Sequence, residues 1–198
     1  SSFNHDSRTT NHAKPLSGFA LLDVGCGGGL ACEPLARLGA SVTGIDASEK
    51  NIAVAKLHAQ QSGLTIDYRC TSAEDFLTSR STMHDPRTTH FDVVLALEIV
   101  EHVADVPLFV KSCAALVKPG GLIVMSTLNR TLKSYALAIV GAEYILGMLP
   151  RGTHDWNRFL RPSELCRELQ KHDIAIAQMT GMVMNPLSWK WQLDAKDL

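Results

Sequence analysis

The sequence has few of the features that mark disulfide-stabilised, zinc-binding or nucleic-acid-binding proteins. Its five cysteines are odd in number and scattered, and none of them forms a C-x-x-C pair. This pattern suits a reducing compartment and packing roles rather than disulfides or zinc. The formal net charge is −1 at pH 7, and no basic stripe is present. We therefore expect no nucleic-acid partner.

Targeting signals and membrane-spanning runs are also missing. The sequence begins without methionine and has no apolar stretch of the signal-peptide type, so any targeting segment is expected to have been removed or never present. No uninterrupted apolar run reaches the roughly 20 residues that a spanning helix needs. Residues 1–17 are polar and predict a poorly ordered or truncated lead-in. Residues 18–198, with an apolar insert at about 128–160, are expected to form one domain.

The stretch from Leu21 to Leu30, LLDVGCGGGL, is the most informative part of the chain. An apolar run typical of a buried strand leads directly into a glycine-rich turn, and a helical pattern follows. The next apolar run ends in Asp46, an acid at the carboxyl end of a second strand. In doubly wound sheets such a turn and acid hold a nucleoside, and the acid accepts hydrogen bonds from the ribose hydroxyls.

The spacing of the glycines indicates which nucleoside is bound. A G-x-G-x-x-G fingerprint beginning at Gly25 would need a glycine where Leu30 stands, and Asp23 precedes Gly25 by two residues. A carboxylate there would repel a diphosphate, which disfavours a nicotinamide-dependent dehydrogenase. It suits S-adenosylmethionine, which has no phosphate and carries an ammonium and a sulfonium. The pattern resembles the first motif of the class I methyltransferases, with Asp23, Gly25, Gly27 and Asp46 as expected cofactor-binding residues.

Two acids and a histidine follow the fourth expected strand. If the chain is helical from Glu98 onward, the i, i+3, i+4 spacing places Glu98, Glu101 and His102 on one face. Two carboxylates and an imidazole at the carboxyl end of a strand suit a divalent cation. The alternative is a glutamate–histidine pair that packs beside the cofactor without a metal.

The rest of the chain alternates between strand and helix patterns. Residues 78–90 predict a surface loop inside the domain. The overall pattern predicts an α/β fold of the doubly wound type, with a mainly parallel seven-stranded sheet and an antiparallel edge strand. Strands are expected at residues 64–70, 91–97 and 122–126, helices at 47–62 and 165–171, and a terminal hairpin within 174–193.

The insert at 128–160 is strongly apolar, above all from Tyr135 to Leu149. Three interpretations remain open: ordinary core, a cover over an apolar substrate, or a segment that lies in the membrane interface. The polar loop that follows contains His154, which is either an ordinary loop residue or a general base near neutral pH.

Several further motifs give a more specific resemblance. They are VTGID, LEIVEHV, LVKPGG, STLNRT and the run SYALAIVGAEYILGMLPRGTHDW, all in order. With them the chain resembles the ubiquinone-biosynthesis O-methyltransferases, which methylate polyprenylated catechols. The resemblance extends over nearly everything from Pro15 to Leu193.

The resemblance implies cofactor contacts at Gly25, Asp46 and Leu97, and a divalent metal, Mg²⁺ or Zn²⁺, at the acid–acid–histidine group described above. It also implies peripheral membrane contact through the insert and other ubiquinone-biosynthesis proteins as partners. The implied location is the matrix side of the mitochondrial inner membrane for a eukaryotic source. For a bacterial source it is the cytoplasm or the membrane periphery.

The expected reaction is an in-line displacement in which a catechol oxygen attacks the sulfonium methyl group. A metal would lower the pKa of the bound hydroxyl, and His154 is a further candidate for accepting the proton. An alternative from another class is a non-catalytic subunit that binds S-adenosylmethionine or a quinone and acts as a scaffold.

Overall fold

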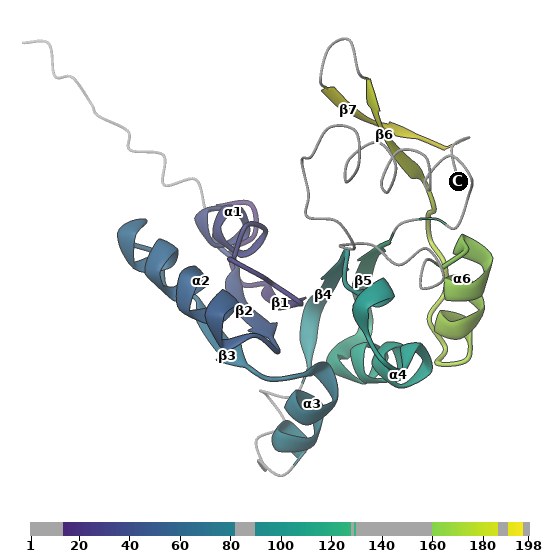
Figure 1. Cartoon of the computed structure of the whole chain (residues 1–198), viewed down its shortest axis with the longest axis horizontal. Helices are drawn as coiled ribbons and strands as arrows, with labels where there is room; N and C mark the ends of the chain where they lie inside the picture. The colour runs from purple at the N-terminus through teal and green to yellow at the C-terminus, as the bar shows by residue number, and fades with distance from the viewer. Residues whose placement is uncertain (1–13, 82–89, 128, 130–159, 186–189, 196–198) are drawn as a thin grey trace, which may run out of the picture.

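The computed structural model describes residues 14–81, 90–127, 129, 160–185 and 190–195. Within them strands and helices alternate as the sequence predicts (Figure 1). The first half contains β1 (Ala20–Val24), α1 (Cys32–Arg37), β2 (Ser41–Asp46), α2 (Glu49–Gln61), β3 (Asp67–Cys70) and α3 (Ala73–Ser81). The second half contains β4 (Phe91–Leu97), the 3₁₀ helix η1 (Val100–His102), α4 (Val106–Leu116), β5 (Val117–Ser126), α6 (Pro162–Gln170), β6 (Gly181–Asn185) and β7 (Lys190–Asp194).

A five-stranded parallel sheet organises the fold, with the strand order β3-β2-β1-β4-β5. The chain runs outward from β1 to β3 and then returns to β4 on the other side of β1. The strand order therefore reverses between β1 and β4, where Asp23 stands opposite Leu95. Ligands of doubly wound sheets bind at the carboxyl ends of the strands at such a reversal. The turn after β1 and the segment after β4 are both at this point.

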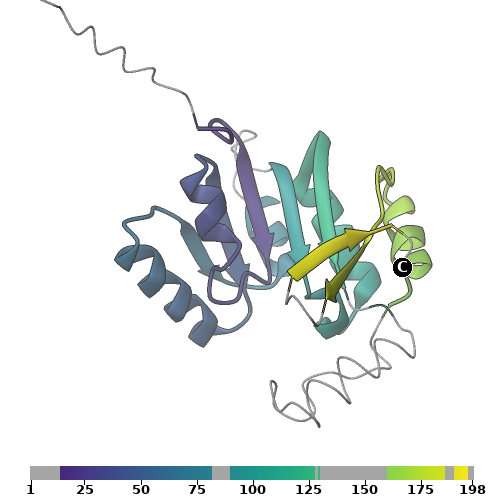
Figure 2. The same ribbon diagram turned by 90° about the horizontal axis from the view of Figure 1, so that it is seen from above.

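Helices cover both faces of the sheet and divide the core into two (Figures 1 and 2). On one face, α1 and α2 pack through small and medium side chains such as Cys32 and Ala55. On the other face, α3, α4 and α6 bury larger residues, including Phe76 and Phe109, against β1, β4 and β5. Strands that are apolar on both sides suit this arrangement, because a parallel sheet is buried between two helical layers.

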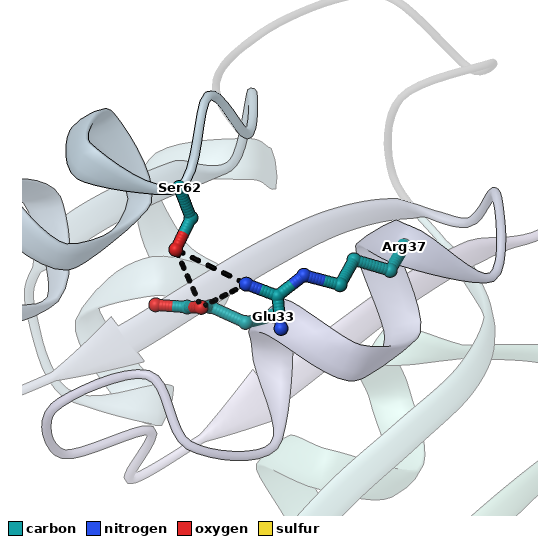
Figure 3. A network of polar contacts seen from close by, with 3 residues as sticks. All are labelled: Glu33, Arg37 and Ser62. Atoms are coloured by element: carbon teal, nitrogen blue, oxygen red, sulfur yellow. Dashed lines mark hydrogen bonds and ion pairs between the residues drawn. The ribbon is translucent and has the colours of Figure 1, made fainter.

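Polar contacts join α1 to the end of α2 (Figure 3). Arg37 Nη2 lies 3.0 Å from Glu33 Oε2 and donates to Ser62 Oγ at 3.1 Å, and that hydroxyl donates to Glu33 at 3.2 Å. Arg37 is more than half exposed, so the ion pair adds little stability. The contacts connect the helix that follows the glycine turn with the residue after α2.

The fold class is confirmed, but the prediction of one seven-stranded sheet is wrong for the described residues. There, β6 and β7 pair with each other and form a separate antiparallel sheet, with Met182 opposite Leu193. Only residues 186–189 separate these strands, and local pairing of this kind costs little loop-closure entropy. The residues from Ile174 to Thr180 form no strand, so the predicted hairpin is confirmed but begins later than expected.

Several other boundaries also differ from the prediction; β3 begins at Asp67 and α6 at Pro162. Helix α3 continues to Ser81, inside the stretch expected to be a loop, while residues 82–89 lie outside the described residues. Strand β5 begins at Val117, not Leu122, because Val117 pairs with Phe91 and Leu122 with Val93. The residues between Val117 and Leu122 form a bulge, with Gly120 at φ 76°. All five cysteines are free, as their spacing predicts.

Most of the insert, with His154, lies outside the described residues, as do residues 1–13. Asn129 and Leu160 form a parallel β-bridge, so the two ends of the insert lie side by side. Within the described segments, none of the helices has the length and apolar character needed to cross a bilayer. The division into a lead-in and one domain stays a prediction.

The side chain of Asp92 in β4 makes pH-dependent contacts with residues of β1 and β5. Asp92 accepts hydrogen bonds from the amide of Ala20 at 2.8 Å and from Lys118 Nζ at 2.8 Å. These donors hold the pKa of Asp92 below its usual value. A carboxyl group with a depressed folded-state pKa stabilises the fold above its unfolded pKa of about 3.9, and this stabilisation is lost as the pH falls through the folded-state pKa.

We expect Asp92→Asn to lower the free energy of unfolding by about 1 kcal/mol at pH 7. The difference from the parent should shrink as the pH is lowered from about 5 to about 2. Urea denaturation over this pH range measures it, and Lys118→Gln should remove only part of the effect. A difference between parent and Asp92→Asn that stays constant across the range would contradict this assignment.

Candidate cofactor and catalytic site

The glycine turn after β1 has a backbone that ordinary residues rarely adopt. Gly25, Gly27 and Gly29 have φ values of 76°, 52° and 86°, all in the left-handed region that favours glycine. At Gly29, a Cβ would also collide with the hydroxyl of Tyr68, whose buried ring lies under the turn. The G-x-G-x-G spacing therefore has a conformational cause at each of its three positions.

The amides of this turn donate hydrogen bonds within the protein. Gly25 and Cys26 donate to the carbonyl oxygen of Ile45 at 2.8 and 3.0 Å, and Gly29 donates to the carbonyl of Cys26 at 2.9 Å. The Gly27 amide donates to Asp46 Oδ2 at 3.0 Å. A turn that holds a diphosphate must leave its N–H groups for phosphate oxygens. This turn suits a ligand without phosphate, as the sequence predicts.

Asp46 connects the turn to the beginning of α2. Besides Gly27, it accepts from the amide of Ser48 at 2.8 Å and from Asn51 Nδ2 at 3.2 Å, both through Oδ1. Ser48 Oγ in turn caps α2 by accepting from the Asn51 amide. A carboxylate has about four acceptor positions, so these three bonds leave one on Oδ2. The half-buried Asp46 can accept a ribose hydroxyl while it continues to hold the turn.

Asp23 lies deeper than the sequence suggests. Its side chain is only 3% exposed, and the Cys32 thiol donates to Oδ2 at 3.2 Å. Burial raises the pKa of Asp23, and the nearby Asp46 carboxylate acts in the same direction. In this arrangement the carboxyl group is hydrogen-bonded to the first residue of α1, and its direct contact with a cationic cofactor group stays a prediction.

A close contact joins the turn to the segment after β4. A Cβ on Gly25 would lie 2.7 Å from Ile99 Cγ1 and 3.0 Å from Ile99 Cβ, distances that real side chains do not tolerate. Ile99 stands between Glu98 and Glu101 in the chain. The absence of a side chain on Gly25 therefore lets the cofactor turn and the acidic segment pack directly together.

The condition for the shared face, a helix from Glu98 onward, is not met in the structure. Glu98 has φ 52°, and a short 3₁₀ helix begins only at Val100. The left-handed residue interrupts the helical path, so the i, i+3, i+4 alignment of the three side chains is lost. Glu98 and His102 are exposed, whereas Glu101 is only 4% exposed.

The arrangement does not fit a shared metal ion. Glu98 Oε1 accepts from the Ser126 hydroxyl at 2.7 Å, and Glu101 Oε2 accepts from the Thr127 hydroxyl at 2.9 Å. In the part of the chain that the structure describes, no three His, Cys, Asp or Glu residues are grouped so that they could hold a metal. The metal ligands named from the sequence therefore stay a prediction that this geometry does not support.

The last of the predicted cofactor-binding residues is Leu97, which ends β4. It is half-buried and pairs in register with Ser126, at the same edge as the glycine turn. Its predicted cofactor contact is untested. The structure also adds residues that the sequence reasoning missed. Ser126 and Thr127 could have been found as hydroxyls at the end of an expected strand and directly after it, whereas no sequence signal marked Ile99 or Tyr68.

The strand order, the glycine turn at its reversal and the acid that ends β2 define a class I methyltransferase fold. Residues 22–125 match the methyltransferase domain family. A magnesium protoporphyrin IX methyltransferase from Synechocystis with bound SAH aligns with a TM-score of 0.61 at 21% identity, over 90% of this chain and 73% of that chain. A structure concerned with converting a disulfide into a thioacetal in echinomycin biosynthesis aligns with a TM-score of 0.66 at 23% identity, over the same shares. At these identities the structures show the fold alone.

Closer relatives identify the family. The ubiquinone biosynthesis O-methyltransferase of Bradyrhizobium diazoefficiens is 56% identical over 180 residues, which are 91% of this chain and 68% of that protein. The protein of the same name from Cereibacter sphaeroides is 54% identical over 184 residues, covering 93% of this chain and 71% of that protein. The chain belongs to the ubiquinone biosynthesis O-methyltransferases.

The chain is therefore an S-adenosylmethionine-dependent O-methyltransferase, and the resemblance stated from its motifs is confirmed. These relatives are bacterial. They give no support to the mitochondrial location, whereas the bacterial alternative is compatible with them.

The contact between Gly25 and Ile99 generates a prediction about cofactor affinity. Gly25→Ala should weaken binding of S-adenosylhomocysteine by at least about tenfold, because the new methyl group meets both positive φ and Ile99. Gly27→Ala is the matched control. Gly27 also has a positive φ, but its Cβ would have nothing within 4 Å, so its loss should be smaller.

Adding Ile99→Ala to Gly25→Ala should restore part of the affinity, with Ile99→Ala alone as the reference. Isothermal titration calorimetry measures the parent and all four variants. Equal affinities for Gly25→Ala and Gly27→Ala would show that the contact with Ile99 is unimportant.

Proposed function

We propose that this O-methyltransferase acts on a polyprenylated catechol of ubiquinone biosynthesis. The proposal is supported by the names of the relatives and by the motifs quoted above. The observation that carries it is the direct packing of the cofactor turn on the acidic segment through Gly25 and Ile99. A methyl acceptor needs polar groups for its hydroxyls beside the methyl donor, and the carboxylates of Glu98 and Glu101 follow β4 at that edge.

Catalysis in this proposal is mainly a matter of positioning. S-adenosylmethionine supplies a methyl group on a sulfonium and leaves as S-adenosylhomocysteine when the catechol oxygen attacks in line. The turn from Gly25 to Gly29 and the acceptor position on Asp46 orient the nucleoside. Orientation of two reactants can supply several kcal/mol of the barrier.

The acceptor hydroxyl must lose its proton, because a free phenol titrates near pH 10. In the proposal the exposed Glu98 carboxylate accepts a hydrogen bond from a catechol hydroxyl and takes its proton as the oxygen attacks the methyl group. His154, which lies outside the described residues, stays a predicted alternative for taking the proton. No step is assigned to a metal, because the described side chains do not converge on one.

The substrate proposal is tested by turnover. The full chain is incubated with S-adenosylmethionine and a polyprenyl dihydroxybenzoate or demethylubiquinol, and the methoxy product is measured by mass spectrometry. We expect methylation of the catechol and little of a monophenol with the same tail, because only the catechol offers a second hydroxyl to the acidic segment. Thermal stabilisation by S-adenosylhomocysteine without any turnover would instead favour the non-catalytic scaffold.

The metal prediction has its own test. Glu98→Ala, Glu101→Ala and His102→Ala are compared with the parent in the turnover assay, with Mg²⁺ or Zn²⁺ added or removed. From the geometry, we expect EDTA to leave the parent rate unchanged. A parent rate that is abolished by EDTA and restored by one of these ions would revive the metal site predicted from the resemblance.

We further propose that the segment from Tyr135 to Leu149 contacts the polyprenyl tail or the bilayer surface, in a bacterial cytoplasmic or membrane-peripheral protein. Its apolar sequence supports this, and contact with other ubiquinone-biosynthesis proteins stays a prediction. In liposome flotation we expect the full chain to rise with the vesicles and a variant lacking the segment to remain behind. Equal partition of the two forms would remove the membrane part of the proposal.

A further inference from the structure

Two hydroxyl–carboxylate bonds join the carboxyl ends of β4 and β5. Ser126 Oγ donates to Glu98 Oε1 at 2.7 Å, and Thr127 Oγ1 donates to Glu101 Oε2 at 2.9 Å. Ser126 is the last residue of β5 and stands in register with Leu97, the last residue of β4. The two hydroxyls therefore come from consecutive residues at the carboxyl end of β5. The two carboxylates come from the segment that follows the neighbouring strand, β4.

Ser126 holds both the backbone and the side chain of Glu98. The Glu98 amide donates to the Ser126 carbonyl oxygen and to its Oγ, each at 3.1 Å, while the same hydroxyl donates to the Glu98 carboxylate. Glu98 adopts φ 52°, a conformation that is unfavourable for a residue other than glycine. Such strain persists only where the surroundings determine it and is concentrated at functional sites.

Thr127 holds a carboxylate that water scarcely reaches. Glu101 is 4% exposed. Its Oε2 accepts a hydrogen bond from the Thr127 hydroxyl. Short bonds from a hydroxyl to a carboxylate are charge-assisted and stronger than neutral ones. The bond therefore restricts the rotation of the Glu101 side chain at the edge of the site.

The position of this segment relative to the cofactor turn is also restricted. Ile99 lies between the two glutamates and packs against Gly25. A change in the orientation of either carboxylate would consequently change its distance from the place where the cofactor binds.

We propose that Ser126 and Thr127 are positioning residues, whose hydroxyls orient Glu98 and Glu101 for the acceptor side of the methyl transfer. The inference rests on the proposed function, because it is the catechol that brings an acceptor hydroxyl to the exposed Glu98 carboxylate, in the segment that the buried Glu101 helps to hold. Preorganised polar groups contribute fully to a rate only while they are held within about 0.5 Å of the productive geometry.

The test uses the full chain and pairs of variants. Ser126→Ala and Thr127→Val remove one hydroxyl each, and Thr127→Ser keeps the hydroxyl while removing the methyl group. Ser112→Ala is the matched control, since it removes a buried hydroxyl in α4 that donates to the carbonyl of Leu108. For each protein, kcat and KM for the catechol are measured, together with the Kd for S-adenosylhomocysteine and the Tm.

We expect Ser126→Ala and Thr127→Val to lower kcat by about 10- to 100-fold, with the Kd for S-adenosylhomocysteine changed by less than about twofold. Thr127→Ser should retain most of the activity, and Ser112→Ala all of it. A purely structural role would lower the Tm and cofactor affinity together with kcat. Parent-like kcat in Thr127→Val, or an equal loss in Thr127→Ser, would overturn the proposal.

A crystal structure of Thr127→Val with S-adenosylhomocysteine separates this inference from the proposed function. If the parent fails to methylate the catechol, the substrate proposal fails, yet the Glu101 carboxylate should still leave its position in the variant. A carboxylate that keeps the same position and order without the Thr127 hydroxyl would contradict the positioning role.

Discussion

The engagement of the turn amides is the constraint on which the site depends. The N–H groups of Gly25, Cys26 and Gly27 are held by Ile45 and Asp46 from the neighbouring strand. A phosphate oxygen would have to displace these partners, and the carboxylates of Asp23 and Asp46 would oppose it. The same turn, together with an acid that keeps one acceptor position, suits a nucleoside with hydroxyls and cationic groups. Cofactor choice therefore follows from hydrogen bonds that are already made within the protein.

The reversal of strand order brings the second half of the site to the first. Because β4 lies beside β1 and parallel to it, the residues that follow β4 lie at the same edge of the sheet as the glycine turn that follows β1. Ile99 fills the space that a side chain on Gly25 would need. One glycine thus serves both the backbone conformation of the cofactor turn and the packing of the acidic segment.

Much of this could be predicted from the sequence, because it is local. The turn and the strand that ends in Asp46 depend on residues within a few positions of one another, and both are confirmed. The helix from Glu98 failed for a different reason. Its spacing was correct for a helix, but the interactions with Ser126, 28 residues away, favour a left-handed residue, and no local pattern reports such a contact.

Burial explains the other differences. Among the described residues, Asp23 and Glu101 are the buried acids, and their hydrogen-bond donors, Cys32 and Thr127, come from other parts of the fold. The separate sheet of β6 and β7 has another cause: strand propensity does not determine which strands pair with each other. The sequence indicated which polar residues lie at the site, whereas the burial and orientation of their side chains depended on contacts across the sheet.

The central claim is that the turn admits a cationic, phosphate-free nucleoside and rejects a diphosphate. Isothermal titration calorimetry of the full chain with S-adenosylmethionine, S-adenosylhomocysteine and NAD⁺ tests it most directly. The account predicts saturable binding of the sulfonium compound and its demethylated product, and no detectable heat of binding with NAD⁺. Saturable binding of NAD⁺ without binding of the other two would contradict it.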